Sequence, residues 1–281
     1  MGTAAIWLLT ACTVLGASVP RADEIEEWPL AGFPEPSGIV YHPARRTLFV
    51  VGDEGDIGEV DLAGKLLRIR NLGGDLEGVT CNPADGRIYV VREGHEIIFE
   101  IDPQLLTITR RFTIDRTYAG NANYLERGGD GIEGVTFVPS KEGGRFFAVN
   151  QYDPPVLLEL AVPLAGKGDG FARATIVRAF TVGSPPLSDL VWDEKNDVFW
   201  IVSALWRSVY VTDRDGHLVR SIRIPGIMQE GIVRLPDGSF VIVQDTGGLI
   251  KWNPAADPFG SSEAHIHAGQ DPVSKNPAGQ R

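Results

Sequence analysis

The sequence predicts an all-β protein, and more narrowly a five-bladed β-propeller of four-stranded antiparallel blades. Three observations support this fold class. Five segments repeat one order of short strands, the strands alternate polar and apolar residues, and the chain of 281 residues contains 33 Gly and 19 Pro. Alternation with a period of two is typical of strands, and Gly and Pro supply the tight turns between them. Repeats of about 40 to 50 residues are typical of propeller blades.

Each repeat contains an alternating apolar strand, a turn of Pro, Asp or Gly, a second apolar strand, a polar break and a third strand. The repeats begin at Pro36, Leu76, Ile132, Leu187 and Gln229. Their second strands read TLFVV, RIYVV, RFFAV, VFWIV and SFVIV, and are rich in β-branched and aromatic residues. Fourth strands are predicted at KLLRIRNL, TITRRFTI, ATIVRAFTV and LVRSIRIP.

No fourth strand follows the fifth repeat. We therefore expect Glu24–Leu30 to complete this blade by pairing with Leu249–Trp252. Such closure would remove an exposed sheet edge. Six blades are the alternative, but the sixth would have to come from the inserts Tyr118–Asp130 and Leu164–Phe171, which lack a strand pattern.

Residues 1–22 are predicted to be an export leader. The apolar run Ile6–Gly16 is too short to span a bilayer. Leu9–Cys12 resembles a lipobox, which would place a lipid on Cys12, whereas Gly16–Ser18 resembles a conventional cleavage site. We expect an exported protein, either periplasmic or anchored to the outer membrane or extracellular. An N-terminus that stays on the protein is the alternative.

The propeller domain is predicted to span residues 23–253, and residues 254–281 a disordered tail with the solvated histidines His265 and His267. The formal net charge of −11 argues against nucleic-acid binding and against electrostatic attachment to anionic lipid. Contact with a membrane is therefore expected only through a lipid on Cys12. The other cysteine, Cys81, is interpreted as a small buried residue.

One position at the head of each first strand forms a predicted ring around the propeller axis. Its members, 40, 56, 55 and 42 residues apart, are Ser37, Glu77, Glu133, Ser188 and Glu230. Three glutamates this close either have raised pKa values or hold a cation. Ca²⁺ suits such an all-oxygen site. In the alternative interpretation, the glutamates accept hydrogen bonds from backbone amides and arginines.

A second predicted ring follows the second strands. It consists of the pairs Asp53-Glu54, Arg92-Glu93, Asn150-Gln151, Ala204-Leu205 and Gln244-Asp245. Glu93 and Asp245 are candidate outer metal ligands. Asp189 is a further candidate ligand or, alternatively, a turn cap. Tyr152, Trp206 and Arg207 lie in the same breaks and are candidates for a ligand-binding rim.

The segments PSGIVYHPARRTLFVV, LEGVT, IEGVTF, LSDLVW and QEGIV resemble the SdiA-regulated family of bacterial exported propellers, which is related to NHL-repeat proteins. The resemblance covers Ile25 to Asn253. It implies a five-bladed propeller that binds Ca²⁺ at a family site and whose biochemical role is undefined. The family often has Glu after the second strand. Glu93 matches, whereas Gln151, Leu205 and Asp245 depart from the pattern, and Asp189 replaces a usual Gly.

Two functions are consistent with these features. The first is a non-catalytic calcium-binding module of the bacterial envelope, monomeric, with a small molecule or an envelope protein as partner. Neither a serine nucleophile elbow nor a histidine accompanies the acidic ring, which argues against a catalytic triad. The alternative is a calcium-dependent hydrolase, similar to lactonases, esterases or phytases, with Glu93 or Asp245 as the base.

Overall fold

The computed structural model describes residues 24–126, 128, 131–141, 143–165 and 170–254, which contain 20 strands and no α-helix. The strands form five four-stranded antiparallel blades. Blade 1 contains β2 (Pro36–His42), β3 (Thr47–Gly52), β4 (Asp56–Val60) and β5 (Leu66–Asn71). Blade 2 contains β6 (Leu76–Cys81), β7 (Ile88–Arg92), β8 (Ile97–Asp102) and β9 (Thr107–Asp115).

The remaining blades follow in chain order. Blade 3 contains β10 (Ile132–Val138), β11 (Arg145–Asn150), β12 (Val156–Ala161) and β13 (Phe171–Thr181). Blade 4 contains β14 (Leu190–Asp193), β15 (Val198–Ser203), β16 (Ser208–Thr212) and β17 (Leu218–Arg223). Blade 5 contains β18 (Gln229–Arg234), β19 (Phe240–Gln244), β20 (Gly248–Asn253) and β1 (Glu24–Pro29).

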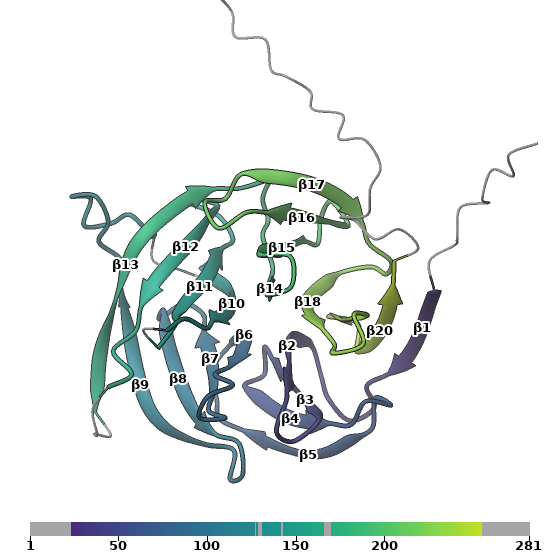
Figure 1. Ribbon diagram of the computed structural model, residues 1–281. Coiled ribbons are helices and arrows are strands. Elements are labelled where there is room, and N and C mark those ends of the chain that lie inside the picture. Colours follow the sequence, from purple (N-terminus) through teal and green to yellow (C-terminus); the bar gives the residue numbers. More distant parts are fainter. Residues whose placement is uncertain (1–23, 127, 129–130, 142, 166–169, 255–281) are drawn as a thin grey trace, which may run out of the picture.

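The first strand of each blade lines the centre of the ring. Figure 1 looks down this ring, with β2, β6, β10, β14 and β18 innermost and the fourth strands outermost. Each inner strand contacts the inner strand of the next blade, including β18 with β2. The ring is therefore closed, and the residues at the heads of the inner strands lie around one axis.

The strand β1 completes the fifth blade as predicted. It pairs antiparallel with β20, so that Ile25 lies opposite Trp252 and Trp28 opposite Leu249. In Figure 1 the purple β1 lies beside the yellow-green β20. The expected pairing of the two ends of the propeller domain is confirmed.

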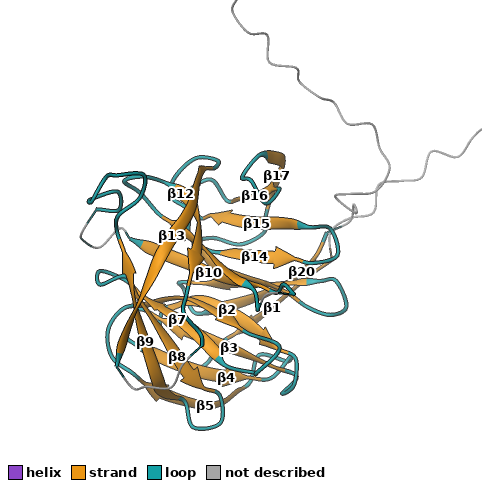
Figure 2. Ribbon diagram, turned by 60° about the vertical axis from the view of Figure 1, so that its left-hand side comes forward, coloured by secondary structure: helices purple, strands orange, loops and turns teal. Residues whose placement is uncertain are grey.

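Blades 2 and 3 are joined at their outer edges, a feature that the sequence pattern did not predict. Their outer strands β9 and β13 are the longest in the fold, with 9 and 11 residues, and they pair in parallel. Phe171 lies opposite Arg111, so Phe171 belongs to β13 and not to the expected insert. Figures 1 and 2 show β9 and β13 side by side.

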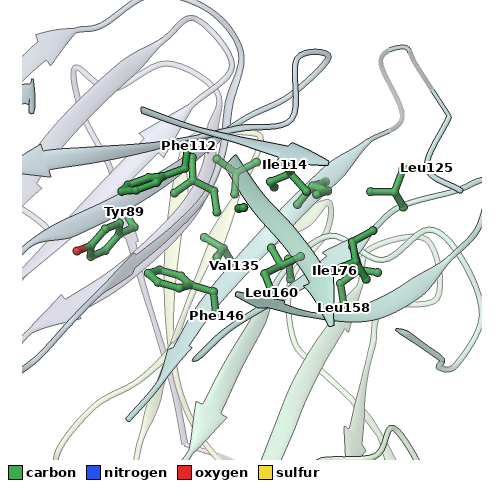
Figure 3. Packing of buried hydrophobic residues seen from close by; sticks show 14 of the residues in the cluster. Tyr89, Phe112, Ile114, Leu125, Val135, Phe146, Leu158, Leu160 and Ile176 are labelled. Atoms are coloured by element: carbon green, nitrogen blue, oxygen red, sulfur yellow. The ribbon is translucent and has the colours of Figure 1, made fainter. Parts of the chain in front are cut away.

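The apolar core lies between neighbouring blades. Its cluster between blades 2 and 3 is drawn in Figure 3, where Tyr89 and Phe146 meet edge to face with ring centroids 4.9 Å apart. Leu125, from the insert after β9, is 1% exposed and packs in the same cluster. The insert therefore adds apolar packing to the joined pair of blades rather than a sixth blade.

A buried ion pair recurs inside three blades. A glutamate on the third strand lies opposite an arginine on the fourth, and the pairs are Glu59–Arg68, Glu100–Arg110 and Glu159–Arg178. In blade 4 the glutamate position holds Val211, opposite Arg220. In blade 5 the charges are reversed, with Lys251 on β20 opposite Glu26 on β1.

We expect Glu59→Gln to lower the free energy of unfolding at pH 7 by about 2 to 3 kcal/mol. Glu59 is 3% exposed and accepts hydrogen bonds of 2.7 Å from Arg45 Nε, Arg68 Nε and Thr47 Oγ1. Burial alone would raise its pKa, but these donors hold the pKa at about 2. The loss is at the low end for a buried pair because the arginine side chains are 29% and 30% exposed.

Because the pKa of Glu59 is depressed in the folded protein, its contribution is present above the unfolded pKa of about 4.3 and disappears as the pH falls through 2. Urea unfolding at pH 7, 4 and 3 should therefore show that the difference in free energy of unfolding between wild type and Glu59→Gln becomes smaller below pH 4. Glu194→Gln, at an exposed turn position, is the control. A difference that stays constant down to pH 3 would contradict the ion-pair origin of the effect.

Candidate functional site

The Glu-Gly pairs mark β-bulges at the heads of the inner strands. In β10, Ile132 pairs with Asn150 and Gly134 with Val149, so Glu133 is the extra residue. The register shifts in the same way at Ser37 in β2 and Glu230 in β18, and across Glu77 and Gly78 in β6. A bulge re-aims a side chain and is frequent beside functional sites.

The glycines of these pairs allow the inner strands to approach closely. A Cβ added to Gly38 would lie 2.1 Å from Glu77 O, and one added to Gly78 would lie 2.5 Å from Val135 N. Added Cβ atoms at Gly134 and Gly231 would lie 2.6 Å from Asp189 Cα and 2.7 Å from Ser37 O. None of the four has a φ in the left-handed region. Close approach, rather than unusual backbone angles, therefore explains these glycines.

The bulges face an acidic cavity at one end of the central channel. Its volume is about 460 Å³, and its lining consists of Glu35, Ser37, Asp53, Asp75, Glu77, Glu93, Glu133, Gln151, Glu230 and Asp245. Eight of these ten residues are carboxylates, and none is basic. The sequence predicted that the ring glutamates and the second-ring residues Glu93 and Asp245 come together, and the structure brings all of them into this cavity.

Glu35 and Asp75 also line the cavity and were not predicted from the sequence. Each stands two residues before a ring position, and its carbonyl oxygen accepts the N–H of a second-ring residue: Asp53 N to Glu35 O is 3.3 Å, and Glu93 N to Asp75 O is 3.0 Å. The same backbone hydrogen bond occurs in two other blades. Gln151 N donates to Gly131 O, and Asp245 N donates to Met228 O, where Gly131 and Met228 also stand two residues before a ring position. Comparing the residues two positions before the ring would have found both carboxylates.

Asp189 lies outside the cavity lining. It occupies the position that holds glycine in the other blades, is 2% exposed, and accepts a 2.9 Å hydrogen bond from Ile232 N through Oδ2. Burial raises its pKa well above the ordinary value. The Asp189 side chain therefore hydrogen-bonds blade 4 to blade 5. The other blades have glycine at this position, where the backbones of neighbouring inner strands approach closely. Among the expected rim residues, Tyr152, Trp206 and Arg207 also lie outside this lining.

The deepest carboxylates are linked to one another. Glu133 is 6% exposed and shares hydrogen bonds with Glu77 and Glu93, which requires a proton between the carboxyl groups. Burial, followed by the charge of Glu77, raises the pKa of Glu133 well above its ordinary value. Burial, followed by Asp53 and Asp75, raises the pKa of Glu77 in the same direction. Ionisation of all these carboxyl groups at once is therefore unfavourable.

The serines at the ring positions partly compensate this charge. Ser37 Oγ donates a hydrogen bond to Asp53 Oδ1, and Ser188 hydrogen-bonds Glu230. Even so, burial raises the pKa of Asp53 and of Glu230. The backbone also contributes donors: Gly131 N lies 3.0 Å from Glu93 Oε1, and a backbone hydrogen bond partly offsets the rise in the pKa of Asp53.

The donor set fits a hard cation. One carboxylate oxygen from each of Asp53, Asp75 and Glu77 lies within 4.8 Å of the others. Asp75 Oδ1 is enclosed and has no hydrogen-bond partner. Oxygen atoms without nitrogen or sulfur ligands are the environment that Ca²⁺ and Mg²⁺ prefer.

Some sequence expectations concern other parts of the chain. Cys81 is a buried free cysteine, which confirms the expected small buried residue, and burial raises its pKa to about 12. The predicted leader with Cys12, and the predicted tail with His265 and His267, lie outside the described residues, apart from residue 254. No helix long and apolar enough to cross a bilayer occurs in the part of the chain that the structure describes.

Comparison with solved structures supports the propeller architecture. The structure of Myxococcus xanthus glutaminyl cyclase superposes with a TM-score of 0.61 at 17% identity, over 83% of this chain and 96% of that chain. At this identity the likeness to the glutaminyl cyclase concerns the fold alone. Virginiamycin B lyase from Staphylococcus aureus gives a TM-score of 0.45 at 16% identity, over 79% and 68% of the two chains, which is too low to support an argument about this chain. No curated protein matches the sequence.

The family is shown by the sequence itself. The model of the SdiA-regulated family matches residues 22–178, which is more than half of the 281-residue chain. The matched region includes blades 1 and 2 and most of blade 3, with the Glu-Gly bulges at Glu77 and Glu133. The resemblance noted from the sequence motifs is therefore confirmed, and the chain belongs to the SdiA-regulated family.

Proposed function

We propose that the acidic cavity binds Ca²⁺ and that the protein is an exported, non-catalytic binding module of the bacterial envelope. One observation carries the calcium proposal: eight carboxylates from four blades line a single cavity whose lining has no basic residue. Carboxylates this close together either become protonated or share a cation. The protonated arrangement around Glu133 is what a cation would replace.

The chain supplies a suitable set of ligands. Glu77, Glu133 and Glu230 stand on the bulges, and Asp53 and Asp75 add oxygens beside Glu77. The enclosed, unpartnered Asp75 Oδ1 supports the fit, because a buried acceptor without a donor is unfavourable. Ca²⁺ accepts about 6 to 8 oxygens in flexible geometry, whereas Mg²⁺ usually keeps several waters. When bound, the ion would supply positive charge and polarise a ligand oxygen.

The envelope location is proposed from the leader sequence, in the periplasm or attached to the outer membrane through Cys12. The partner is proposed to be a small molecule or an envelope protein, and the protein itself a monomer. The mouth of the cavity is the surface that this partner would contact.

Metal analysis and thermal unfolding test the calcium proposal on protein beginning at Asp23. We expect about one Ca²⁺ per chain by mass spectrometry. A free Ca²⁺ concentration of 100 times the dissociation constant should stabilise the fold by about 2.7 kcal/mol. For a chain of this length the melting temperature should rise by about 5 to 10 °C. EDTA should reverse the rise, and Mg²⁺ should reproduce it poorly. A metal-free protein that is indifferent to both Ca²⁺ and EDTA would overturn the proposal.

A calcium-dependent hydrolase remains the second candidate because both proposed bases, Glu93 and Asp245, line the cavity. Burial raises the pKa of Glu93, a change that favours proton transfer near neutral pH. Lactone, ester and phosphoester panels with added Ca²⁺ test this candidate. Turnover that EDTA and Glu93→Gln both abolish would support it, and absence of turnover on all three panels would eliminate it.

A further inference from the structure

The mouth of the acidic cavity has two chemically different sides. Blades 1, 2, 3 and 5 present polar residues of the second ring, of which Asp53 is exposed and Asp245 partly exposed. Blade 4 presents Ala204-Leu205 at this position, and here Leu205 and Trp206 are 66% and 54% exposed. The missing polar residue in blade 4 therefore coincides with an exposed apolar surface.

The loop before β18 extends this apolar surface. Ile227 and Met228 are 55% and 50% exposed, and Met228 O accepts the hydrogen bond from Asp245 N, 3.1 Å long. Ile224 N donates to Arg207 O at 3.0 Å, which ties this loop to the turn that carries Trp206. We call the four exposed side chains the apolar rim: Leu205, Trp206, Ile227 and Met228.

The apolar rim is held in a defined conformation. Trp206 Nε1 donates a 3.0 Å hydrogen bond to Pro185 O, and Ile227 N donates to Gln244 Oε1 at 2.8 Å. Arg207 and Met228 both have a φ of 49°, a left-handed conformation that is unfavourable for residues with a Cβ. Seven other non-glycine residues in the described part of the chain, among them Glu35 and Glu96, also have a positive φ, so this conformation belongs to the turns of the fold and does not mark a site by itself. The exposed, oriented tryptophan is a ready contact surface.

The hollow at the mouth is wider than the acidic cavity alone. A second depression of about 460 Å³ adjoins it and shares Glu35 and Asp245 with it. Its other lining residues are Phe33, Pro34, Glu54, Thr246 and Gly247. Both volumes lie within the range of about 300 to 1,000 Å³ that is usual for small-molecule sites.

The charge of the mouth decides the kind of ligand. One divalent cation offsets two negative charges, whereas the two hollows together carry nine carboxylates. The exposed Glu35 and Glu54, which are not among the proposed calcium ligands, therefore leave the mouth negative even with a metal at the floor. An anionic ligand would be repelled by these groups, and a cationic ligand would be attracted.

We propose that this mouth binds an amphipathic organic cation, with its ammonium or guanidinium group among Glu35, Glu54 and Asp245 and its apolar body on the apolar rim. The proposal rests on the proposed binding role of the mouth, and its contacts do not require calcium. The indole of Trp206 adds apolar contact area for the body of the ligand.

Isothermal titration calorimetry with simple probes tests this proposal in 150 mM salt, with calcium and with EDTA. Octylammonium should bind, ethylammonium should bind about 10-fold or more weakly because it lacks the apolar body, and octanoate should not bind. A capped Lys-Leu-Leu peptide compared with octylammonium distinguishes a peptide side chain from a small amine as the source of the cation. Octanoate binding as tightly as octylammonium would overturn the proposal, as would the absence of binding by both cationic probes.

Variants locate the contacts. Trp206→Ala and Asp245→Asn should each weaken octylammonium binding by about 10-fold. Leu218→Ser is the matched control, because Leu218 is 57% exposed on the outer strand β17. This variant should bind octylammonium as tightly as the wild type. Loss of binding in Leu218→Ser, or unchanged binding in both mouth variants, would overturn the proposed location.

The same samples separate this proposal from the calcium proposal. If Ca²⁺ raises the melting temperature but no organic cation binds, the ligand proposal fails and the calcium proposal stands. If octylammonium binds a protein that is indifferent to Ca²⁺ and EDTA, the calcium proposal fails and the ligand proposal stands.

Discussion

Replacement of Glu133 by Gln should abolish stabilisation by Ca²⁺ and at the same time make the calcium-free protein more stable. Gln has the shape of the protonated carboxyl group that the calcium-free cluster favours, so the fold should tolerate it. Removal of one buried acidic group relieves repulsion from Glu77 and should stabilise the calcium-free protein by about 1 kcal/mol, or about 2 to 4 °C. The calcium-dependent rise of about 5 to 10 °C should disappear.

The pH dependence has a defined sign. The folded pKa of Glu133 lies above its unfolded value of about 4.3, so the folded protein binds the proton more tightly than the unfolded chain. The stability of the calcium-free wild type should therefore fall as the pH rises above 4.3 towards the folded pKa. Glu133→Gln should fall less over the same window.

Melting curves in EDTA and in saturating Ca²⁺, from pH 5 to 8, measure both effects. Glu194→Gln removes one carboxylate at an exposed turn position and should behave as wild type in both buffers. A Glu133→Gln variant that keeps the full calcium shift would mean that the cation is held without Glu133, for example among Asp53, Asp75 and Glu77.

Gly38→Ala should produce the largest loss of stability among single-methyl changes at the inner ring. The new Cβ would lie 2.1 Å from Glu77 O, a backbone atom that moves only if β2 and β6 separate. We expect a loss of about 3 kcal/mol or more, which is about 6 to 12 °C in melting temperature.

Gly170→Ala is the matched control, because no atom lies within 4 Å of its added Cβ and its φ is outside the left-handed region. Thermal and urea unfolding of both variants measure the difference. If Gly38→Ala unfolds within 0.5 kcal/mol of Gly170→Ala, the inner strands are less tightly packed than the structure indicates.

The blade pattern was predictable because each blade repeats locally. The second strands are buried and almost continuously apolar, as in β3 and β19, so they were visible without knowledge of their neighbours. The pairing of β1 with β20 was also predictable, because the fifth repeat lacked a fourth strand and the strand before the first repeat belonged to no other blade. Both inferences depend on counting strands rather than on side-chain detail.

The parallel pairing of β9 with β13 was not predictable for a physical reason. The ladder between them is made of backbone groups that every sequence has, so the side chains of an outer strand do not show whether its far edge meets water or another strand. Asp189 shows a similar limit. Its position in the repeat suggested a ring carboxylate, but only the inter-blade contact with Ile232 reveals where its oxygen lies.

The pairing of β1 with β20 also determines which blade can form last. Blades 1 to 4 are each made from consecutive strands and need only local contacts, whereas blade 5 joins positions as distant as Glu24 and Asn253, 229 residues apart. Contacts of such high sequence separation carry the largest loop-closure entropy and slow folding. An incomplete chain therefore leaves β1 as an unpaired strand with three glutamates, whose charge discourages pairing with other chains until β20 is available.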